Sequence, residues 1–257
     1  MQLVERLAAS GRRSETDATE RVDAYWSRFL DVSASVLRTP GVVVTPHGNR
    51  LRGYRGVWFF VRDRSAVVSA PVGWVARLEE GLRSAASYDL LSADAAARVI
   101  DAAVDEVIGP SFQGWLSPES FRPVNSRDVQ QIAASKTGPV QVFRSSLPRQ
   151  EWKHGGIDLD VAPVWASYHG PSIVSLGQLR PHPDGAVDPC IVTHPSHRRR
   201  GHALRLVSAM TEAALSQERL ILYQTLSSNL PALSIARRLG FAQYANLVAV
   251  RLTPEVG

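Results

Sequence analysis

The sequence predicts an α+β protein whose sheet is mixed and mostly antiparallel, with flanking helices. Several strand-like runs follow one another directly, with turn residues instead of helices between them, which is typical of antiparallel pairing. Further along the chain the pattern changes to alternating strands and helices. With 257 residues, 44% of them hydrophobic, the chain is long enough for one large or two small domains with a substantial core.

The first 116 residues predict an N-terminal accessory α+β domain. A helix is expected through Val22, Trp26 and Leu30, after a polar lead-in. Three β-rich runs then predict a strand meander, because Pro, Gly, Asn and charged residues separate them. These runs are Val42–Val44, Val57–Val61 and Ala66–Ser69.

Two helices and a strand are expected to complete this domain. The first helix carries apolar residues at helical spacing, namely Val72, Val75, Leu78 and Leu82. The second has Ser92 as its N-cap and directs Val99, Ile100 and Val104 inward. The strand DEVIGPSFQGWL (105–116) is expected to break at Gly109-Pro110.

A second domain is expected over residues 117–257, because the pattern breaks into Pro, Ser and Asn between Ser117 and Asp128. Three elements follow: a helix with Val129, Ile132 and Ala133, a strand VQVFR (140–144), and a polar insertion (145–160). Three consecutive strands come next, VWASY (164–168), IVSLGQLR (173–180) and AVDPCIVT (186–193), separated by the turns His169-Gly170-Pro171 and PHPDG.

The remaining elements alternate between helix and strand. A helix begins near Gly201 and places Ala203, Val207, Met210 and Ala214 inward. A strand LILYQTL (220–226), a helix Pro231–Leu239 ended by Gly240, and a strand YANLVAVRL (244–252) follow.

Bulk composition sets limits on function. No apolar run approaches the roughly 20 residues that span a bilayer, and the N-terminus has no apolar signal region, so a cytoplasmic location is expected. Cys190 is the only cysteine, which excludes an internal disulfide and a cysteine-based metal site, and no metal is expected. The net charge of +5 comes almost wholly from arginine. It fits either codon bias or a field that attracts anions, and charge alone does not choose between them.

The segment HPSHRRRGHALR (194–205) has two interpretations. It is either a basic surface for nucleic acid or a loop that holds one phosphate group. A glycine at the mouth of a helix favours the loop, because helix N-termini expose unpaired N–H groups and a partial positive charge. Gly201 and Ala203 carry almost no side chain, so a diphosphate could approach the backbone, with the arginines adding charge.

Arg198 to Ala203 resembles the pyrophosphate loop Gln/Arg-x-x-Gly-x-Gly/Ala of the GNAT superfamily of acyl-CoA-dependent N-acetyltransferases. Pro195 stands where the family usually has a proline. A second landmark follows in the right order, with Asn229 after a strand and Leu239-Gly240-Phe241 after a short helix. The resemblance covers about residues 120–257. It implies a GNAT fold there, with acetyl-CoA as acyl donor.

The resemblance also implies which residues bind CoA. Backbone N–H groups of the loop would hold the pyrophosphate, and the preceding strand edge would hold the pantetheine arm. The implied residues are Ile191, Val192, Thr193, Arg198, Arg199, Arg200, Gly201, His202, Ala203 and Asn229. Two simpler explanations stay open: Asn229 could only cap the helix that Pro231 begins, and Gly240 is explained as a left-handed helix end.

The general acid of the family is missing from its usual place. Many members have a tyrosine seven residues after the asparagine, where this chain has Ala236. Tyr223 and Tyr244 lie nearby in sequence, but neither matches that place. A missing general acid typically costs about 10²–10⁴ in rate. A thiol with a pKa of about 8.5 can still leave unassisted. Water, Ser227, Ser228 or Ser234 could also substitute, and Ser228 is the candidate that we carry forward.

The general base is open as well. The fourth GNAT strand often supplies a carboxylate, which makes Asp188 the candidate, although it could be a strand-end residue before Pro189. His194 and His197 have suitable unperturbed pKa values but fit the phosphate side of the loop better. Cys190 fits a core position. The insertion could supply Glu151, Trp152 and His154 to an acceptor cleft, or be an exposed loop.

These observations predict an acetyl-CoA-dependent N-acetyltransferase that transfers an acyl group directly to the primary amine of a small molecule. The thioester and amine would meet in a split between the fourth and fifth strands of the GNAT fold. A non-catalytic CoA-binding or sensing module is the alternative, because of Ala236. No second basic or aromatic stripe supports nucleic acid as a partner. The N-terminal half is either a degenerate copy of the same fold or an unrelated cap, and the protein is expected to be a monomer or homodimer.

Overall fold

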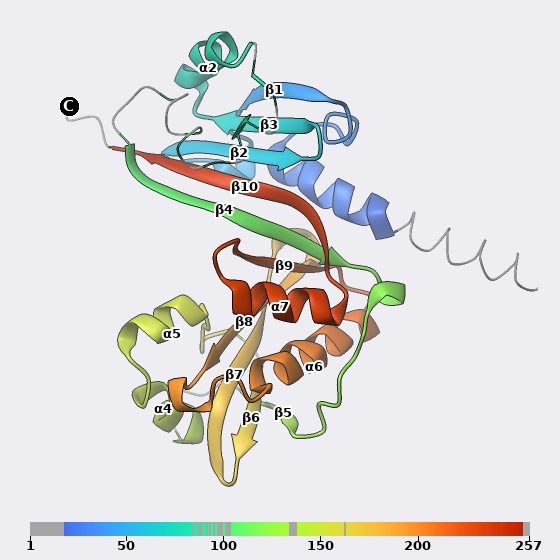
Figure 1. Ribbon diagram of the computed structural model, residues 1–257, viewed down its shortest axis with the longest axis vertical. Helices are drawn as coiled ribbons and strands as arrows, with labels where there is room; N and C mark the ends of the chain where they lie inside the picture. Colours follow the sequence, from blue (N-terminus) through green and yellow to red (C-terminus); the bar gives the residue numbers. More distant parts are fainter. Residues whose placement is uncertain are drawn as a thin grey trace, which may run out of the picture. The chain divides into compact units, whose positions relative to one another are not determined.

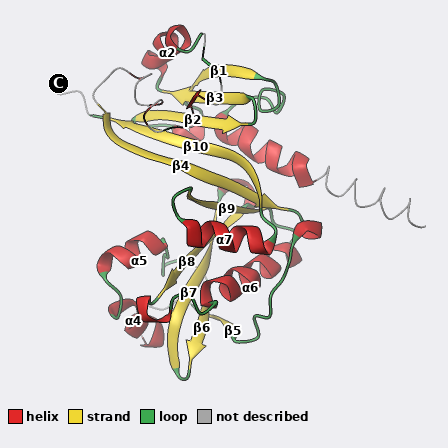
Figure 2. Ribbon diagram, viewed as in Figure 1, coloured by secondary structure: helices red, strands yellow, loops and turns green. Residues whose placement is uncertain are grey.

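The protein was analysed as a computed structural model (Figures 1 and 2). It describes residues 18–83, 85–86, 89–90, 92, 94, 96, 100, 104–133, 138–161 and 163–253.

Ten strands in this described part form one mixed sheet in the order β1-β3-β2-β10-β4-β9-β8-β7-β6-β5. The strands are β1 (Gly41–Pro46), β2 (Gly56–Arg62), β3 (Ser65–Ala70), β4 (Val104–Leu116), β5 (Val129–Ile132), β6 (Val164–His169), β7 (Ser172–Pro181), β8 (Val187–Thr193), β9 (Ile221–Leu226) and β10 (Ala242–Leu252). The helices that accompany them are α2 (Val75–Gly81), α4 (Gly138–Ser145), α5 (Arg149–Gly155), α6 (His202–Ser216) and α7 (Leu230–Leu239). Residues 18–30 are helical as well. The predicted α+β class with a mixed sheet and flanking helices is confirmed.

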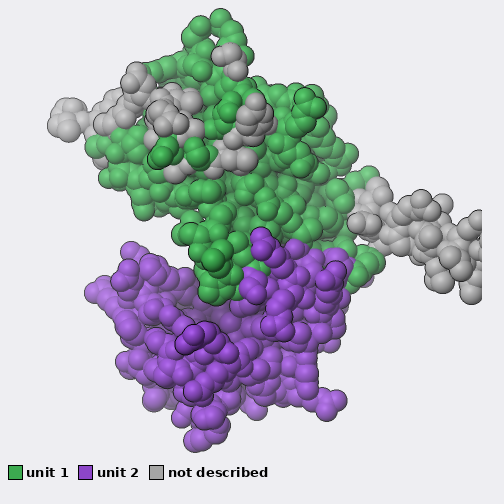
Figure 3. Space-filling view, viewed as in Figure 1, with its two compact units in different colours: residues 1–119, 224–233, 242–257 green, residues 120–223, 234–241 purple. Residues whose placement is uncertain are grey.

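The chain forms two compact units (Figure 3). Unit 1 contains residues 1–119, 224–233 and 242–257, and unit 2 contains residues 120–223 and 234–241. The division into domains at residue 117 stays a prediction.

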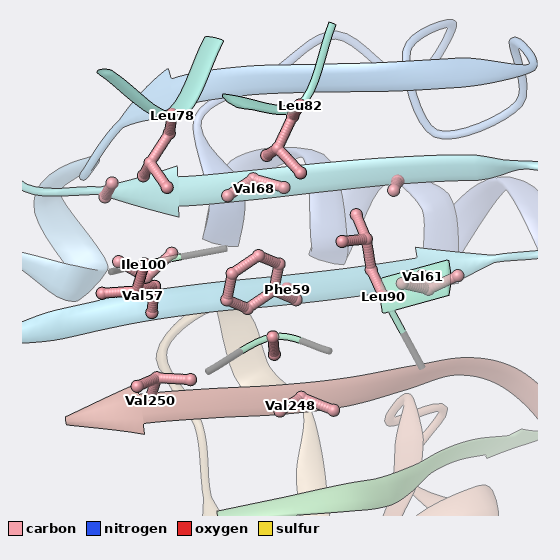
Figure 4. Close-up of a cluster of buried hydrophobic side chains, with 13 residues drawn as sticks. Val57, Phe59, Val61, Val68, Leu78, Leu82, Leu90, Ile100, Val248 and Val250 are labelled. Atoms are coloured by element: carbon pink, nitrogen blue, oxygen red, sulfur yellow. The ribbon is translucent and has the colours of Figure 1, made fainter. Parts of the chain in front are cut away.

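Unit 1 has a core between its strands and α2. Leu78 of α2 and Leu82 pack over Phe59 of β2 and Val68 of β3, together with Val248 from β10 (Figure 4). Strand β10 lies between β2 and β4 and is antiparallel to both. A segment from the far end of the sequence therefore completes the sheet that the first 116 residues begin.

The three N-terminal strands are present as predicted, but their order is not a meander. Strands β2 and β3 form an antiparallel hairpin, and β1 pairs with β3 in parallel. The long link from β1 to β2, which contains the short 3-10 helix Asn49–Leu51, lets the chain place β1 on the far edge of β3.

The second half of this region differs in two details. Val104, predicted to face inward from a helix, is the first residue of β4. Gly109-Pro110 does not end the strand. The register of β4 against β10 shifts by one residue at this point, which is a β-bulge, and the pairing with β10 continues on both sides of it. The helix begun at Ser92 is present at residues 94, 96 and 100, with Ile100 fully buried, while Val99 lies outside the described residues.

Unit 2 has helices on both faces of its strands. Neighbouring residues of a strand point to opposite faces. Leu176 of β7 packs in the cluster with α4 and α5. A Cβ on Gly177, the next residue, would lie 2.8 Å from the Met210 side chain of α6. Helices α4 and α5 therefore cover one face and α6 the other (Figure 1).

The predicted secondary structure of two short segments was wrong. Residues 129–132, predicted as a helix, form β5 at the sheet edge beside β6, and VQVFR, predicted as a strand, lies in helix α4. Apolar residues in so short a run fit both periods. In α4 the i, i+3 pair Val140 and Phe143 is buried, whereas Val142 is 70% exposed. The polar insertion contains helix α5 rather than only loop. The other predicted elements of unit 2, and α7 and β10, are confirmed within a few residues.

Candidate functional site

Strands β8 and β9 run parallel but pair only where they begin. Their register consists of Val187 opposite Ile221, and the Val187 N–H donates to the Leu220 carbonyl at 2.9 Å. All residues of both strands are described, and no other pair joins them. The strands separate after this point, so the edge of β8 that faces β9 is unpaired. This unpaired edge of β8 is referred to below as the split.

Only part of this edge can donate hydrogen bonds into the split. Neighbouring residues of a strand direct their backbone groups to opposite edges. The His194 N–H donates to Val174 of β7 at 2.9 Å, so Val192, two residues earlier, also faces β7. Ile191 and Thr193 therefore direct their N–H groups toward the split. Of the three β8 residues predicted to bind pantetheine, these two have amides available.

The loop between β8 and α6 exposes a row of amides. Arg199 and Gly201 have positive φ values of 62° and 81°, which turns the backbone of the loop toward the start of α6. Gly201 is the N-cap and offers no side-chain cap. The first amide bonded at this end is that of Arg205, to the Gly201 carbonyl at 3.0 Å. Within the described residues, the N–H groups of 199–204 have no partner, an arrangement that is typical of anion sites at the start of a helix.

The three arginines of the loop differ in their contacts. Arg198 donates to the Thr193 carbonyl (3.3 Å) and to Oε2 of Glu151 on α5 (2.5 Å), so it fixes the loop against β8 and α5. Arg199 and Arg200 are exposed and free to add positive charge around the amides. Glu151, predicted for an acceptor cleft, is thus a partner of the loop.

His202 supports the loop from beneath. Its side chain is 7% exposed, and Nδ1 lies 2.8 Å from Ser167 Oγ on β6 and 3.1 Å from Nη2 of Arg205. Burial, followed by the charge of Arg205, lowers the pKa of His202. A neutral ring can accept from Arg205 at Nδ1, which holds the ring beneath the loop.

His197 lies beside three other histidines. The ring of His197 is 5.2 Å from that of His169, 5.9 Å from that of His194 and 6.2 Å from that of His202. Burial and the charges of Arg200, His169 and His194 lower the pKa of His197. In the described part of the chain, no group of three or more His, Cys, Asp or Glu is placed to hold a metal ion.

Asp188 is buried, and both of its carboxylate oxygens have hydrogen-bond partners. Its two oxygens accept from Nε and Nη2 of Arg180 (3.0 and 2.6 Å), and His182 Nε2 lies 2.9 Å from Oδ1. Burial alone would raise the pKa of Asp188, but the hydrogen bonds from His182 and Arg180 outweigh it and hold the pKa below its usual value. The carboxylate is therefore charged at neutral pH and a weak proton acceptor.

Cys190 packs in the core of unit 2. It belongs to the cluster beneath α4 and α5, and a Cβ on Gly156 would lie 3.3 Å from its Sγ. Burial, followed by the charge of Asp188, raises the pKa of the thiol to about 11. The thiol is protonated at neutral pH and is not a nucleophile.

Asn229 and Gly240, from the second landmark of the sequence, lie at the two ends of helix α7. Asn229 Oδ1 accepts from the Ala232 N–H at 3.3 Å, which is the N-cap bond of α7. Gly240 has φ +95°, and a Cβ there would lie 1.9 Å from the Ser120 carbonyl oxygen, so only glycine fits. Ser228 is exposed, whereas Ala236 is completely buried.

Neither tyrosine near the missing general acid is available as a proton donor. Tyr223 is buried against Phe241, with ring centroids 5.0 Å apart, and burial raises its pKa. Tyr244 donates to Asp23 at 2.5 Å and lies 2.9 Å from Arg62 Nη1. Its pKa is also raised, by burial and by Asp23.

Two groups of residues at the site were not found from the sequence. They are the partners of the loop, Ser167 and Asp128 (which pairs with Arg205 at 2.9 Å), and the partners of Asp188, Arg180 and His182. Arg180 and His182 follow from antiparallel pairing across a short turn, which a register prediction could have supplied. Ser167 and Asp128 carried no sequence signal. Of the other cleft candidates on α5, Trp152 is half-buried and His154 exposed.

Known proteins resemble this chain in sequence over one segment and in fold over most of its length. Residues 179–250 match the family described as FR47-like protein. An acetyltransferase of the GNAT family from Colwellia psychrerythraea is 14% identical, with a TM-score of 0.53, over 93% of this chain and 97% of that one. A GCN5-related N-acetyltransferase-like protein from Streptococcus suis is 15% identical, with a TM-score of 0.45, over 91% and 98%. No curated protein matches the sequence.

The sheet order, the split strands and the loop at α6 define a protein with the GNAT fold. The GNAT fold that the resemblance implies is thereby confirmed, and residues 179–250 match the FR47-like family. One structural neighbour, the aminoglycoside N-acetyltransferase AAC(6')-Iy, was solved in complex with CoA; it is 16% identical, with a TM-score of 0.34, over 46% of this chain and 92% of that one. Helices long and apolar enough to cross a bilayer do not occur in the described segments.

Proposed function

We propose that this protein is an acetyl-CoA-dependent N-acetyltransferase that transfers the acyl group directly to the primary amine of a small molecule. The observation that carries this proposal is the row of unpartnered amides at residues 199–204, which follows directly on the split edge of β8. A loop of this kind binds a diphosphate, and an unpaired strand edge next to it binds an extended amide chain. CoA contains both groups in that order.

The chemistry would rest on positioning and on backbone dipoles. The N–H groups of Ile191 and Thr193 are directed at the split, where either can donate to a thioester carbonyl. Such a hydrogen bond strengthens as negative charge develops on that oxygen during attack by the amine. The amine nitrogen forms a bond to the carbonyl carbon, the carbon–sulfur bond breaks, and the amine loses a proton. No covalent enzyme intermediate is needed, and the protonated Cys190 would not form one.

Proton transfer would be the weak part of this mechanism. Asp188, as the base, would act through water, and its lowered pKa limits how strongly it draws the proton. Ser228, as the donor to the CoA thiolate, is exposed, so water competes with it. We expect the reaction to depend on solution pH mainly through the fraction of neutral amine.

The alternative is a CoA-binding or sensing module with little or no turnover. It is favoured by Ala236, which is completely buried and has no proton to donate. Release of free thiol from acetyl-CoA, measured over a panel of small amines beside equilibrium binding of CoA, separates the two. Turnover of any small amine supports the transferase, and tight CoA binding without turnover supports the module.

The loop assignment has its own test in Gly201→Val. A side chain at φ +81° is strained, and its Cβ would approach Arg205 to 2.9 Å. We expect CoA binding to weaken at least tenfold. Gly185→Val is the matched control, because Gly185 has φ +79° in the same unit and nothing within 4 Å of its Cβ position. Unchanged affinity in the Gly201 variant would overturn the assignment. A salt-dependent affinity for DNA or RNA that CoA does not compete with would replace it with nucleic-acid binding.

A further inference from the structure

A cavity lies in unit 2, between helices α4 and α5. Its volume is about 370 Å³, and its lining residues are Gln141, Arg144, Ser145, Leu147, Arg149 and Trp152. None of them belongs to the pyrophosphate loop or to the split edge of β8. The cavity therefore has no role in binding CoA as described above.

The cavity is lined by two positively charged side chains and by no negatively charged one. Arg144 and Arg149 have no carboxylate partner anywhere in the described part of the chain, and no Asp or Glu lines the cavity. Three other arginines of the same unit, Arg180, Arg198 and Arg205, each lie between 2.5 and 2.9 Å from an acidic oxygen. Two unpaired guanidinium groups around one cavity favour an anion, and their planar forks fit a carboxylate.

The cavity also has an apolar wall. The guanidinium carbon of Arg144 lies 5.3 Å from the centre of the Trp152 ring. Trp152 itself packs against the buried cluster that contains Cys190 and Val192 of β8, which holds the ring in place. The Trp152 ring lines the same cavity as Arg144 and Arg149, a combination that fits a ligand that joins a carboxylate to an apolar group.

The same helix connects the cavity to the proposed reaction site. Helix α5 packs directly on β8, since a Cβ on Gly155 would lie 2.9 Å from Val192 Cβ. Val192 stands between Ile191 and Thr193, the two residues whose amides face the split. Through Glu151 and Arg198, α5 also contacts the pyrophosphate loop. Helix α5 therefore contacts both the cavity and the strand that would carry the thioester.

We propose that the cavity between α4 and α5 binds the carboxylate of the acceptor, so that the acceptor is an amine that also carries a carboxylate, such as an amino acid or a peptide. This inference rests on the proposed function, since only a transferase has an acceptor. The carboxylate would pair with Arg144 and Arg149, and the apolar part of the ligand would lie against Trp152.

Acceptors that differ only in the carboxylate test the proposal. Phenylalanine and phenethylamine form one pair, and leucine and 3-methylbutylamine another. The variants are Arg144→Gln and Arg149→Gln, with Arg237→Gln on the exposed face of α7 as control. We expect each cavity variant to raise KM for the amino acids about tenfold, with kcat and the KM of the simple amines changed less than twofold, because one charge-assisted hydrogen bond is lost. Arg237→Gln should change neither. Equal effects on both members of a pair would overturn the proposal.

Binding without turnover gives a second readout. N-acetylphenylalanine and N-acetylphenethylamine are titrated calorimetrically into the CoA-bound protein. The acid should bind more tightly than its carboxylate-free partner, and either cavity variant should remove the difference. Equal binding of the two compounds by the wild-type protein overturns the carboxylate subsite. A protein that binds CoA and the acid but acetylates no amine refutes the transferase and leaves an anion site, so the two failures are distinguishable.

Discussion

Asp188 is a buried carboxylate whose charge is balanced by two neighbours from the adjoining strand end. We expect Asp188→Asn to destabilise the protein by about 2–4 kcal/mol at pH 7, because the Arg180 and His182 interactions lose their anion within a buried site. Urea unfolding measures the free energy. Turnover at saturating acceptor should fall only modestly if the carboxylate is a weak base. A loss of more than a hundredfold in kcat with an unchanged fold would make it the principal base.

The same residue predicts a pH dependence with a definite sign. Its pKa in the folded state lies below the unfolded value of about 3.9, so its stabilising effect is complete above that pH and is lost as pH falls through the folded pKa. The stability difference between wild type and Asp188→Asn should therefore shrink on acidification below about pH 4. A difference that stays constant from pH 7 to pH 3 would contradict the assignment of charge.

Asp23 has a comparable arrangement in unit 1. The carboxylate is 1% exposed and accepts from Arg38, Arg62 and the hydroxyl of Tyr244. Removing that hydroxyl leaves part of a buried acceptor unsatisfied, so Tyr244→Phe should cost about 1–3 kcal/mol in the free energy of unfolding. Tyr168→Phe, at a half-buried tyrosine on β6, is the control and should change stability by less than about 0.5 kcal/mol. Equal effects of the two substitutions would show that the hydrogen bond contributes nothing.

Single residues were predictable where backbone geometry dictates the amino acid. Gly201 and Gly240 were identified from sequence, and both have positive φ values. The side-chain partners of the loop were not identified, because Glu151 and Ser167 reach it from elements that are distant in sequence. Spacing along the chain carries no information about such contacts before the fold is known.

At the scale of elements, two helices of seven residues allow a matched comparison. Both α2 and α5 end in glycine, Gly81 and Gly155. A Cβ on Gly155 would lie 2.9 Å from Val192 Cβ, whereas a Cβ on Gly81 meets nothing within 4 Å. Gly155→Ala should destabilise the protein by about 1–3 kcal/mol through overpacking between α5 and β8. Gly81→Ala should be neutral or stabilise by up to about 1 kcal/mol.

Thermal or urea unfolding of both variants checks this comparison. Effects of the same sign and size would mean that α5 moves away from β8 without cost. In that case α5 would be a mobile wall of the cavity between α4 and α5, not a fixed one.

Elements with a long or strongly patterned sequence were predicted well. Helix α6 combines a glycine N-cap with four apolar residues at helical spacing, and three of the four, Val207, Met210 and Ala214, are completely buried. Segments 129–132 and 140–144 are too short for the spacing of their apolar residues to distinguish a helix from a strand. Tertiary packing determines which of the two forms. The edge position of β5 and the face that α4 buries become visible only when β6 and β7 are in place.

At the scale of the whole molecule, β10 determines whether unit 1 can fold. Val248 and Val250 of β10 are fully or almost fully buried, and the strand supplies partners to β2 and β4. A chain that ends at residue 241 loses this burial and exposes two strand edges. We expect no cooperative unfolding transition for unit 1 and a strong tendency to aggregate.

Urea unfolding followed by tryptophan fluorescence measures this, since Trp26 and Trp58 lie in unit 1. A chain that ends at residue 253 retains all of β10 and should unfold as the full-length chain does. Residues 1–116 expressed alone also lack β10 and should not fold. A cooperative transition in either shortened chain that lacks β10 would show that the first 116 residues form an independent domain.

The interleaving of β10 with the first strands has a consequence for biosynthesis. Strands β2 and β4 are synthesised more than a hundred residues before β10, which pairs with both. The edges of β2 and β4 that pair with β10 therefore have no partner while unit 2 is translated. Unit 2, whose segments end at residue 241, can acquire its contacts first. We therefore expect unit 2 to fold before unit 1, and the nascent chain to be most prone to aggregation before β10 is synthesised.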